Sequence, residues 1–242
     1  MILAVASCMM KYTSYSSGGA SEVFDKIPFS LKALLGIGSY DVTKASGFFA
    51  FIFLYLELTV AIHAVLLGAG IISKEERDKT TEFLMIKPVS RQTILTAKLS
   101  AALVNIVVVN IVTLVSSIAI VGSYNKGKDA TPEIVMFMIS MFVVQLVFLS
   151  LGAAIAAIVK NPKSAGSLGT GMMIIAFVIS EITNLTDKIN FINVLSPFKY
   201  FSYYDLVAGK GINIIILLLS LLLVALFTAS TYFFYQKRDL YV

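Results

Sequence analysis

Charged residues are scarce in this sequence. Aspartate, glutamate, lysine and arginine make up 14% of the 242 residues, whereas 58% are hydrophobic, and the mean hydropathy is +0.88. Soluble domains carry about 25% charged residues. The composition therefore excludes an ordinary soluble globular protein and indicates a membrane protein. The net charge of +5 does not indicate a nucleic-acid partner, because lysines and arginines in a membrane protein are distributed by membrane side.

Cysteine and histidine each occur once, as Cys8 and His63. A single cysteine excludes a disulfide framework within the chain, and a single histidine excludes a multi-histidine metal site. The sequence also lacks a G-x-x-x-x-G-K-[ST] phosphate loop and has no G-x-S-x-G motif beside His63. We therefore expect no catalytic residue, no metal and no cofactor on this chain, and an intramembrane enzyme is a poor fit.

Long apolar segments dominate the chain. A membrane span needs about 20 mostly apolar residues. Residues 1–10 are apolar but too short, and we expect them to be the second half of a first span whose beginning is absent. We predict an all-α, polytopic helical membrane protein with a single transmembrane domain over residues 1–242 and five full spans. The predicted spans are 47–73, 94–122, 134–159, 165–181 and 212–235.

The basic residues predict the orientation of these spans. They are concentrated in the segment 74–98, in the short loop 160–164 and in the C-terminal tail. Alternation of the spans places all three segments on one face of the membrane. The positive-inside rule makes that face cytoplasmic.

The first of these segments, KEERDKTTEFLMIKPVSR from Lys74, has the features of a structured elbow. Ser73 and Glu76 fit a capping box that would start a new helix. Thr80 or Thr81 can cap a second short helix over 82–87, which Pro88 would end, since the residue before proline avoids the helical region. Ser90 can then cap the next span. We therefore predict a helix–turn–helix loop.

The residue order of this loop carries a resemblance. E-E-R-x-x-T-x-E-F-L-x-x-K-P-V-S-R, followed by I-L-x-x-K, resembles the first cytoplasmic loop of permease subunits of type-2 ABC exporters. The LSPFKYF stretch and the FFYQKRDL tail also resemble segments of these permeases. This chain departs from many relatives by carrying Lys79 where they have glycine. The elbow residues matched by the motif are Glu75, Glu76, Arg77, Thr80, Glu82, Phe83, Leu84, Pro88, Val89, Ser90 and Arg91, followed by Lys98.

The resemblance implies a function and partners. In that family, the loop forms a coupling elbow, here 74–93, that sits on a separate ATPase subunit. It implies two permease chains, as a homo- or heterodimer, and two ATPase chains that bind ATP and Mg²⁺. The chain would then be the membrane-spanning permease subunit of an ATP-driven exporter in the plasma membrane, with the loops 74–93 and 160–164 and the C-terminus in the cytoplasm. An ion-coupled secondary transporter or channel, or a non-transporting assembly factor, are the alternatives.

Polar residues within apolar spans are costly and are candidates for function. They are Glu57, His63, Asn105, Asn110 and Gln145. We expect them either to line an export path or to form interhelical hydrogen bonds.

A second candidate site lies before the last span. Pro197 prevents an uninterrupted helix, and the aromatic residues after it include Phe198, Tyr200 and Phe201. We expect a short interfacial or re-entrant helix here, acting as an outer gate or as an ordinary aromatic belt at the headgroup level. The sequence does not indicate the substrate.

Overall fold

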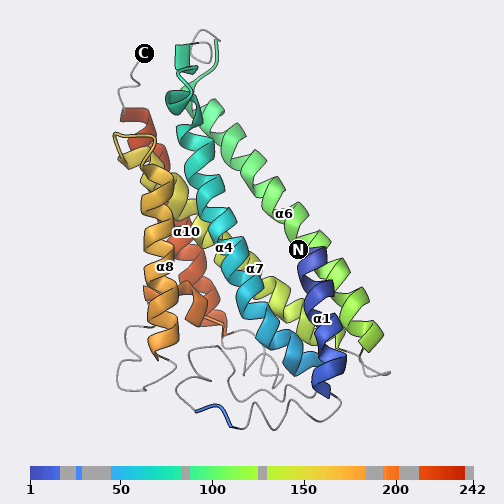
Figure 1. Ribbon diagram of the computed structural model, residues 1–242. Helices are drawn as coiled ribbons and strands as arrows, with labels where there is room; N and C mark the ends of the chain where they lie inside the picture. Colours follow the sequence, from blue (N-terminus) through green and yellow to red (C-terminus); the bar gives the residue numbers. More distant parts are fainter. Residues whose placement is uncertain are drawn as a thin grey trace. The chain divides into compact units, whose positions relative to one another are not determined.

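The computed structural model is built from helices (Figure 1). No strand occurs in the parts of the chain that the structure describes. The predicted all-α membrane architecture is confirmed, because five of the helices are long and apolar enough to cross a membrane. The described residues are 1–16, 26–28, 45–82, 88–124, 130–183, 193, 195–201 and 213–237.

The five long helices correspond to the five predicted spans. A shorter apolar helix, α1 (Ile2–Ser16), precedes them, and a short 3-10 helix, η2 (Pro197–Lys199), precedes the last one. The long helices are α4 (Ala45–Arg77), α6 (Arg91–Tyr124), α7 (Thr131–Ile158), α8 (Ala165–Thr183) and α10 (Ile214–Lys237).

Helices α4 and α6 are longer than the apolar segments within them. They contain 33 and 34 residues, and at 1.5 Å per residue each is about 50 Å long. The hydrocarbon core of a bilayer is about 30 Å thick. The extra length includes charged turns, with Lys74 and Arg77 in the last turn of α4. These turns need no apolar environment, because lysine, glutamate and arginine are themselves good helix formers.

The contacts divide the chain into two compact units. Unit 1 comprises Met1–Thr59, Val109–Met141 and Ala176–Ile216, and unit 2 comprises Val60–Val108, Phe142–Ile175 and Leu217–Val242. Helices α4, α6, α7, α8 and α10 each contribute residues to both units.

The core of unit 1 is aromatic. The rings of Phe53 on α4 and Phe137 on α7 lie with their centroids 4.8 Å apart, and Phe49 lies 6.0 Å from Phe137. All three side chains are fully buried. In the same unit Tyr12 of α1 contacts Phe48, with 5.6 Å between ring centroids. Offset and edge-on pairs of this kind add stability beyond their buried area.

The core of unit 2 is made largely of small residues. Alanines and glycines of α4, α7 and α8 allow these helices to approach closely. A methyl group added to Gly68 would overlap the backbone carbonyl of Leu149, and one added to Gly152 would overlap the carbonyl of Val65. This reciprocal contact between α4 and α7 is the small-residue packing expected of membrane helices. The buried cluster consists of Ala69, Ile72, Leu95, Ala153, Ala156, Ala157, Ala165 and Tyr235.

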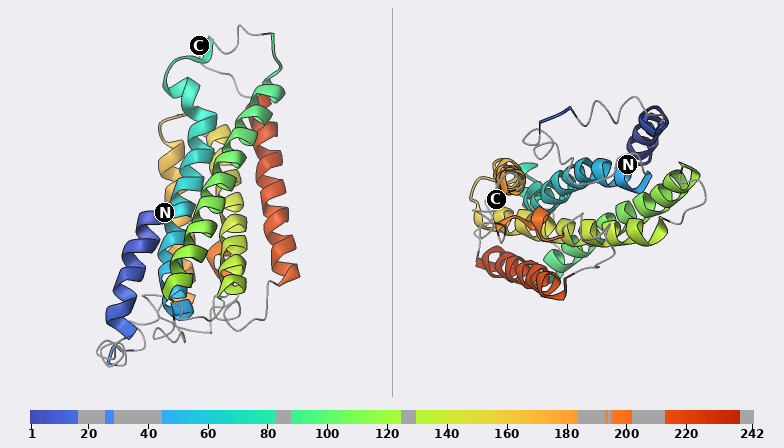
Figure 2. Two further views of the ribbon diagram at one scale, coloured as in Figure 1. Left: turned by 90° about the vertical axis from the view of Figure 1, so that its right-hand side faces the viewer. Right: turned by 90° about the horizontal axis from the view of Figure 1, so that it is seen from below.

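The start of α6 and the end of α10 lie side by side in both views of Figure 2. Two hydrogen bonds in unit 2 join them. The hydroxyl oxygens of Thr96 and Tyr232 lie 2.7 Å apart. Arg91 donates from Nη1 to the carbonyl of Gln236 at 3.4 Å. The start of α6 is therefore held by the last helix.

Candidate functional site

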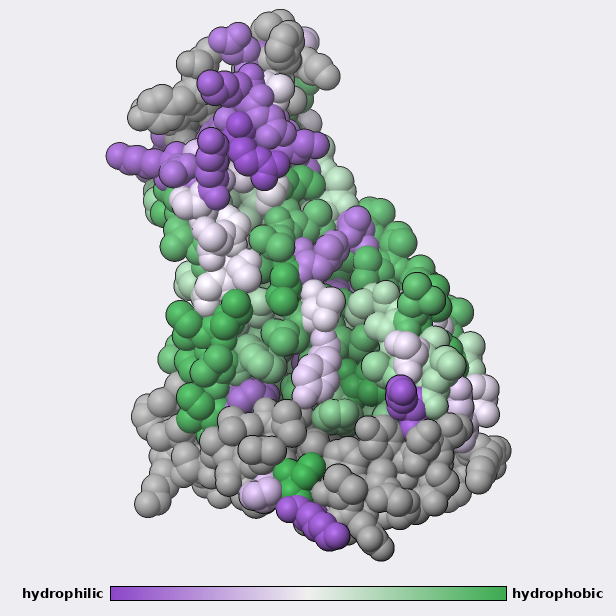
Figure 3. Space-filling view, viewed as in Figure 1, coloured by the Kyte–Doolittle hydropathy of each residue, from purple (hydrophilic) through white to green (hydrophobic). Residues whose placement is uncertain are grey.

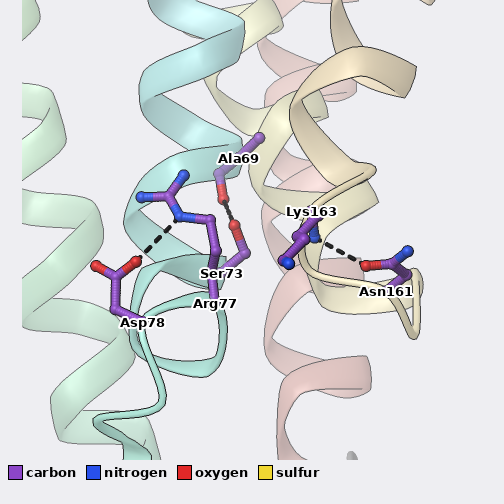
Figure 4. A network of polar contacts seen from close by, with 6 residues as sticks. All are labelled: Ala69, Ser73, Arg77, Asp78, Asn161 and Lys163. Carbon is purple, nitrogen blue, oxygen red and sulfur yellow. Dashed lines mark hydrogen bonds and ion pairs between the residues drawn. The ribbon is translucent and has the colours of Figure 1, made fainter.

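The end of α4 differs from the prediction. Ser73 does not start a new helix, because it lies inside α4, where its hydroxyl donates to the carbonyl of Ala69 at 2.8 Å (Figure 4). A serine inside a helix commonly bonds to the carbonyl four residues earlier. The predicted capping box of Ser73 and Glu76 is therefore wrong. The charged residues that begin at Lys74 lie on a continuous helix that ends at Arg77.

Lys79 is the residue at which the chain turns away from this helix. Its φ angle is +56°, in the left-handed region. The turn is closed by backbone bonds from the Asp78 N–H to the Lys74 carbonyl and from the Thr80 N–H to the Glu75 carbonyl, both 2.8 Å. A left-handed residue after the last turn is a common way to end a helix, and glycine is usual there. The position at which the sequence departs from the pattern of the family it resembles, with Lys79 where glycine is expected, is thus the position that adopts this conformation.

Glu75 and Lys98 form an ion pair that joins the last turns of α4 to α6. The two side chains are 24% and 12% exposed. A second ion pair, between Arg77 and Asp78, has an N–O distance of 3.2 Å and joins neighbouring residues at the end of α4 (Figure 4). Its side chains are 47% and 43% exposed. Only the first pair connects two different helices.

Ser90 caps α6 as predicted. The backbone N–H of Thr93 donates to the Ser90 hydroxyl oxygen at 3.2 Å, and the two hydroxyl oxygens lie 2.8 Å apart. This bond satisfies one of the N–H groups that a helix start leaves without a partner. The start of α6, like the end of α4, therefore has a defined geometry.

The middle of the predicted elbow lies outside the described residues. This applies to Phe83 and Leu84 and to most of the short helix predicted over 82–87. Thr81 and Glu82 are helical, with Thr81 buried and Glu82 exposed. Figure 3 shows hydrophilic side chains gathered around the end of α4, beyond the apolar surface of the spans. The exposed elbow residues among those described are Arg77, Thr80, Glu82, Pro88, Ser90 and Arg91, whereas Glu75 and Glu76 are partly buried.

The predicted loop 160–164 also belongs to unit 2 and is a tight turn. The side-chain oxygen of Asn161 accepts a hydrogen bond from the Lys163 N–H at 3.0 Å (Figure 4). The Asn161 carbonyl accepts from the Ser164 N–H at 3.1 Å, one residue before α8 begins. Asparagine favours such turns because its side chain bonds to the backbone two residues later.

The five polar residues predicted within the spans divide into two groups. Glu57 and Asn110 are buried in unit 1, and Gln145 is fully buried in unit 2. His63 and Asn105 belong to unit 2 and are exposed on α4 and α6. The structure thus does not place the five on one common surface, and their role in an export path stays a prediction.

The predicted outer gate lies in unit 1 and includes η2. Phe198, Tyr200 and Phe201 are all buried, and Phe198 contacts Phe177 of α8 with 5.4 Å between ring centroids. Ser196 anchors the segment, because its hydroxyl donates to the carbonyl of Ala176 at 2.7 Å. Burial raises the pKa of the Tyr200 phenol above its usual value of about 10. The expected short helix is present as the 3-10 helix that begins at Pro197.

Two features were not predicted from the sequence. Glu181 on α8 is a second acid buried in unit 1. In the sequence it is the last residue of the predicted span 165–181, and an acid at that position is typical of the end of a span rather than of a buried site. The pairing of Glu75 with Lys98 was also not predicted. The only signal was that both residues match the same motif, 23 positions apart.

The fold and these sites define a multi-pass helical membrane protein whose charged residues gather around the turn after the first long helix. A comparison with protein families matches residues 2–240 to the ABC-2 family transporter proteins. Since the match covers nearly the whole chain, the protein belongs to this family and is a membrane permease of an ABC transporter. No curated protein matches the chain.

Proposed function

We propose that this chain is the membrane subunit of an ATP-driven exporter, and that a separate ATPase subunit binds its elbow at 74–93. The observation that carries the proposal is the geometry of that elbow. The motif residues that the structure describes lie on or beside two helix ends with defined geometry, the end of α4 closed at Lys79 and the start of α6 capped by Ser90. A force applied to either helix end would therefore reach that helix directly.

The ATPase site is proposed to lie on the partner. This sequence has no phosphate loop, and we expect the purified chain to hydrolyse no ATP. ATP and Mg²⁺ would bind to the ATPase subunit, and a second permease chain would complete the transporter. The elbow, the loop 160–164 and the C-terminus would face the cytoplasm, and the membrane would be the plasma membrane.

The test is co-purification of an ATPase. The tagged chain is solubilised from its native membranes in a mild detergent and purified by affinity. The eluate is then assayed for Mg²⁺-dependent ATP hydrolysis. Glu82→Arg reverses an exposed charge of the elbow, and we expect it to reduce the co-eluting activity strongly, because charge complementarity guides such contacts. Lys11→Glu is the matched control, since it reverses an exposed charge on α1 in the segment predicted to lie on the opposite side.

The proposal predicts ATP hydrolysis with the wild type and with the Lys11 variant, and little with the Glu82 variant. If the Glu82 variant keeps the co-eluting ATPase activity and the Lys11 variant loses it, the elbow is not the contact surface. If no ATPase activity co-elutes with any form, the exporter assignment fails. The ion-coupled transporter and the assembly factor then become the better explanations.

A further inference from the structure

Glu75 has two structural roles at the end of α4. Its backbone carbonyl accepts the Thr80 N–H at 2.8 Å, which closes the turn around the left-handed Lys79. Its carboxylate binds the ammonium group of Lys98 on α6. The residue that fixes how the chain leaves α4 is therefore also the residue that holds α4 to α6.

Lys98 lies inside α6 rather than at its exposed start. It follows Arg91, the first residue of the helix, by seven positions, or about 10 Å along the axis. Its side chain is only 12% exposed. A partly desolvated pair is screened less by water and salt than a surface pair, so this contact constrains the two helices more than the exposed pair of Arg77 and Asp78 can.

We propose that Glu75 and Lys98 are the positioning pair of the elbow, which sets the direction in which the elbow leaves α4 relative to α6. With the pair intact, a displacement of the elbow moves the end of α4 and the start of α6 together. Without it, the turn at Lys79 moves with α4 alone. The inference rests on the proposed function, since it explains how the elbow would transmit motion.

The proposal also accounts for two positions of the sequence motif. The first glutamate of E-E-R and the lysine of I-L-x-x-K are far apart in the chain, and the structure brings them together. Charge exchange should preserve the pair. A lysine at position 75 would lie in the last turn of α4, near the helix C-terminus, where a positive charge is favoured by the helix dipole.

The first experiment measures the geometry of the elbow in the isolated full chain. In a Cys8→Ala background, spin labels are attached to Thr80→Cys and Gln92→Cys, which are both exposed, and their distance distribution is recorded in lipid nanodiscs. Lys98→Met, which keeps most of the side-chain volume, is expected to broaden and shift this distribution. The exchange Glu75→Lys with Lys98→Glu is expected to restore it. Asp78→Asn removes only the exposed pair and is expected to change nothing.

A distribution in Lys98→Met that matches the wild type would overturn the proposal, as would an exchange variant that behaves like Lys98→Met. A merely stabilising ion pair would lower the thermal midpoint of Lys98→Met without moving the labels, so the midpoint is measured alongside. These measurements need no ATPase and therefore remain decisive if the proposed function fails.

The second experiment uses the complex with the co-purified ATPase. We expect ATP to shift the distance between the labels at positions 80 and 92 in the wild type. In Lys98→Met, the ATPase should still co-elute, but the ATP-induced shift should be lost. Retention of the full shift would overturn the proposal. Loss of the ATPase from the wild type would instead contradict the proposed function.

Discussion

The hydroxyl groups of Thr96 on α6 and Tyr232 on α10 form a hydrogen bond of 2.7 Å. The Thr96 hydroxyl also donates to the Gln92 carbonyl at 2.9 Å, so the threonine is left to accept from the tyrosine. The bond joins two residues that are 136 positions apart in the chain, and it holds the start of α6 to α10 within unit 2.

We expect Tyr232→Phe to lower the stability of the protein by about 0.6–2 kcal/mol, the range found for hydrogen bonds between membrane helices. Thr96→Val should have a similar effect, and the double variant should lose no more than either single one, because both remove the same bond. Thermal unfolding in detergent measures the three midpoints. Fully additive losses would show that the two hydroxyl groups act independently.

Glycines 68 and 70 of α4 should respond in opposite ways to the same change. Gly68→Ala places a methyl group against the Leu149 carbonyl, and the resulting overpacking should cost about 1–3 kcal/mol. A methyl group at Gly70 meets nothing within 4 Å, so Gly70→Ala should leave stability unchanged or raise it by about 0.4–1 kcal/mol. The fraction of monodisperse protein after gel filtration and the thermal midpoint distinguish the two. Equal effects would contradict the close contact between α4 and α7.

Serines 73 and 90 provide a test of where the helices begin. Ser90→Ala removes the cap of α6 and should cost about 0.5–2 kcal/mol. Ser73→Ala removes only a bond within α4 and introduces a better helix former, so stability should stay the same or rise slightly. Thermal midpoints of the two variants give the comparison. A larger loss for Ser73→Ala would indicate that a helix begins there after all.

Lys79 should tolerate glycine but not a β-branched residue. The left-handed conformation costs a non-glycine residue about 1–2 kcal/mol, while glycine costs about 0.5–1 kcal/mol through the entropy of the unfolded chain. Lys79→Gly should therefore change stability by no more than about 1 kcal/mol. Lys79→Val should be clearly less stable than Lys79→Gly by the same assay. If valine is tolerated equally well, the turn does not require this conformation.

The proposed orientation can be tested by labelling, because the chain has a single cysteine to remove. In a Cys8→Ala background, one cysteine is placed at Glu82, Lys163 or Lys26. A membrane-impermeant maleimide should label positions 82 and 163 in inside-out vesicles and position 26 in right-side-out vesicles. Labelling of positions 82 and 26 from the same side would contradict the alternation of spans.

The sequence was sufficient to predict the helices but not their ends. The five spans followed from apolar length alone, which is a strong constraint in a bilayer. The end of α4 was wrong by one turn, since a serine followed by glutamate reads the same way at a helix start and inside a helix. Whether Ser73 caps a helix or bonds to the carbonyl of Ala69 depends on how this turn is packed, and its neighbour Ile72 lies with Leu95 in the buried cluster of unit 2.

The candidate sites show the same limit. The cap at Ser90 was predictable because it depends on residues three positions apart. The contact of Glu75 with Lys98 depends on how two antiparallel helices are aligned, and hydropathy does not encode that alignment. Exposure was also not predictable, since Glu57 and His63 lie in the same span, yet only Glu57 is buried.

The length of α4 has a mechanical consequence. The helix has 33 residues and is about 50 Å long. A tilt of about 10° about its midpoint displaces its end, about 25 Å away, by about 4 Å, comparable to the rise of three residues. A small angular change within the membrane therefore becomes a displacement of several ångströms at the turn beside Lys79.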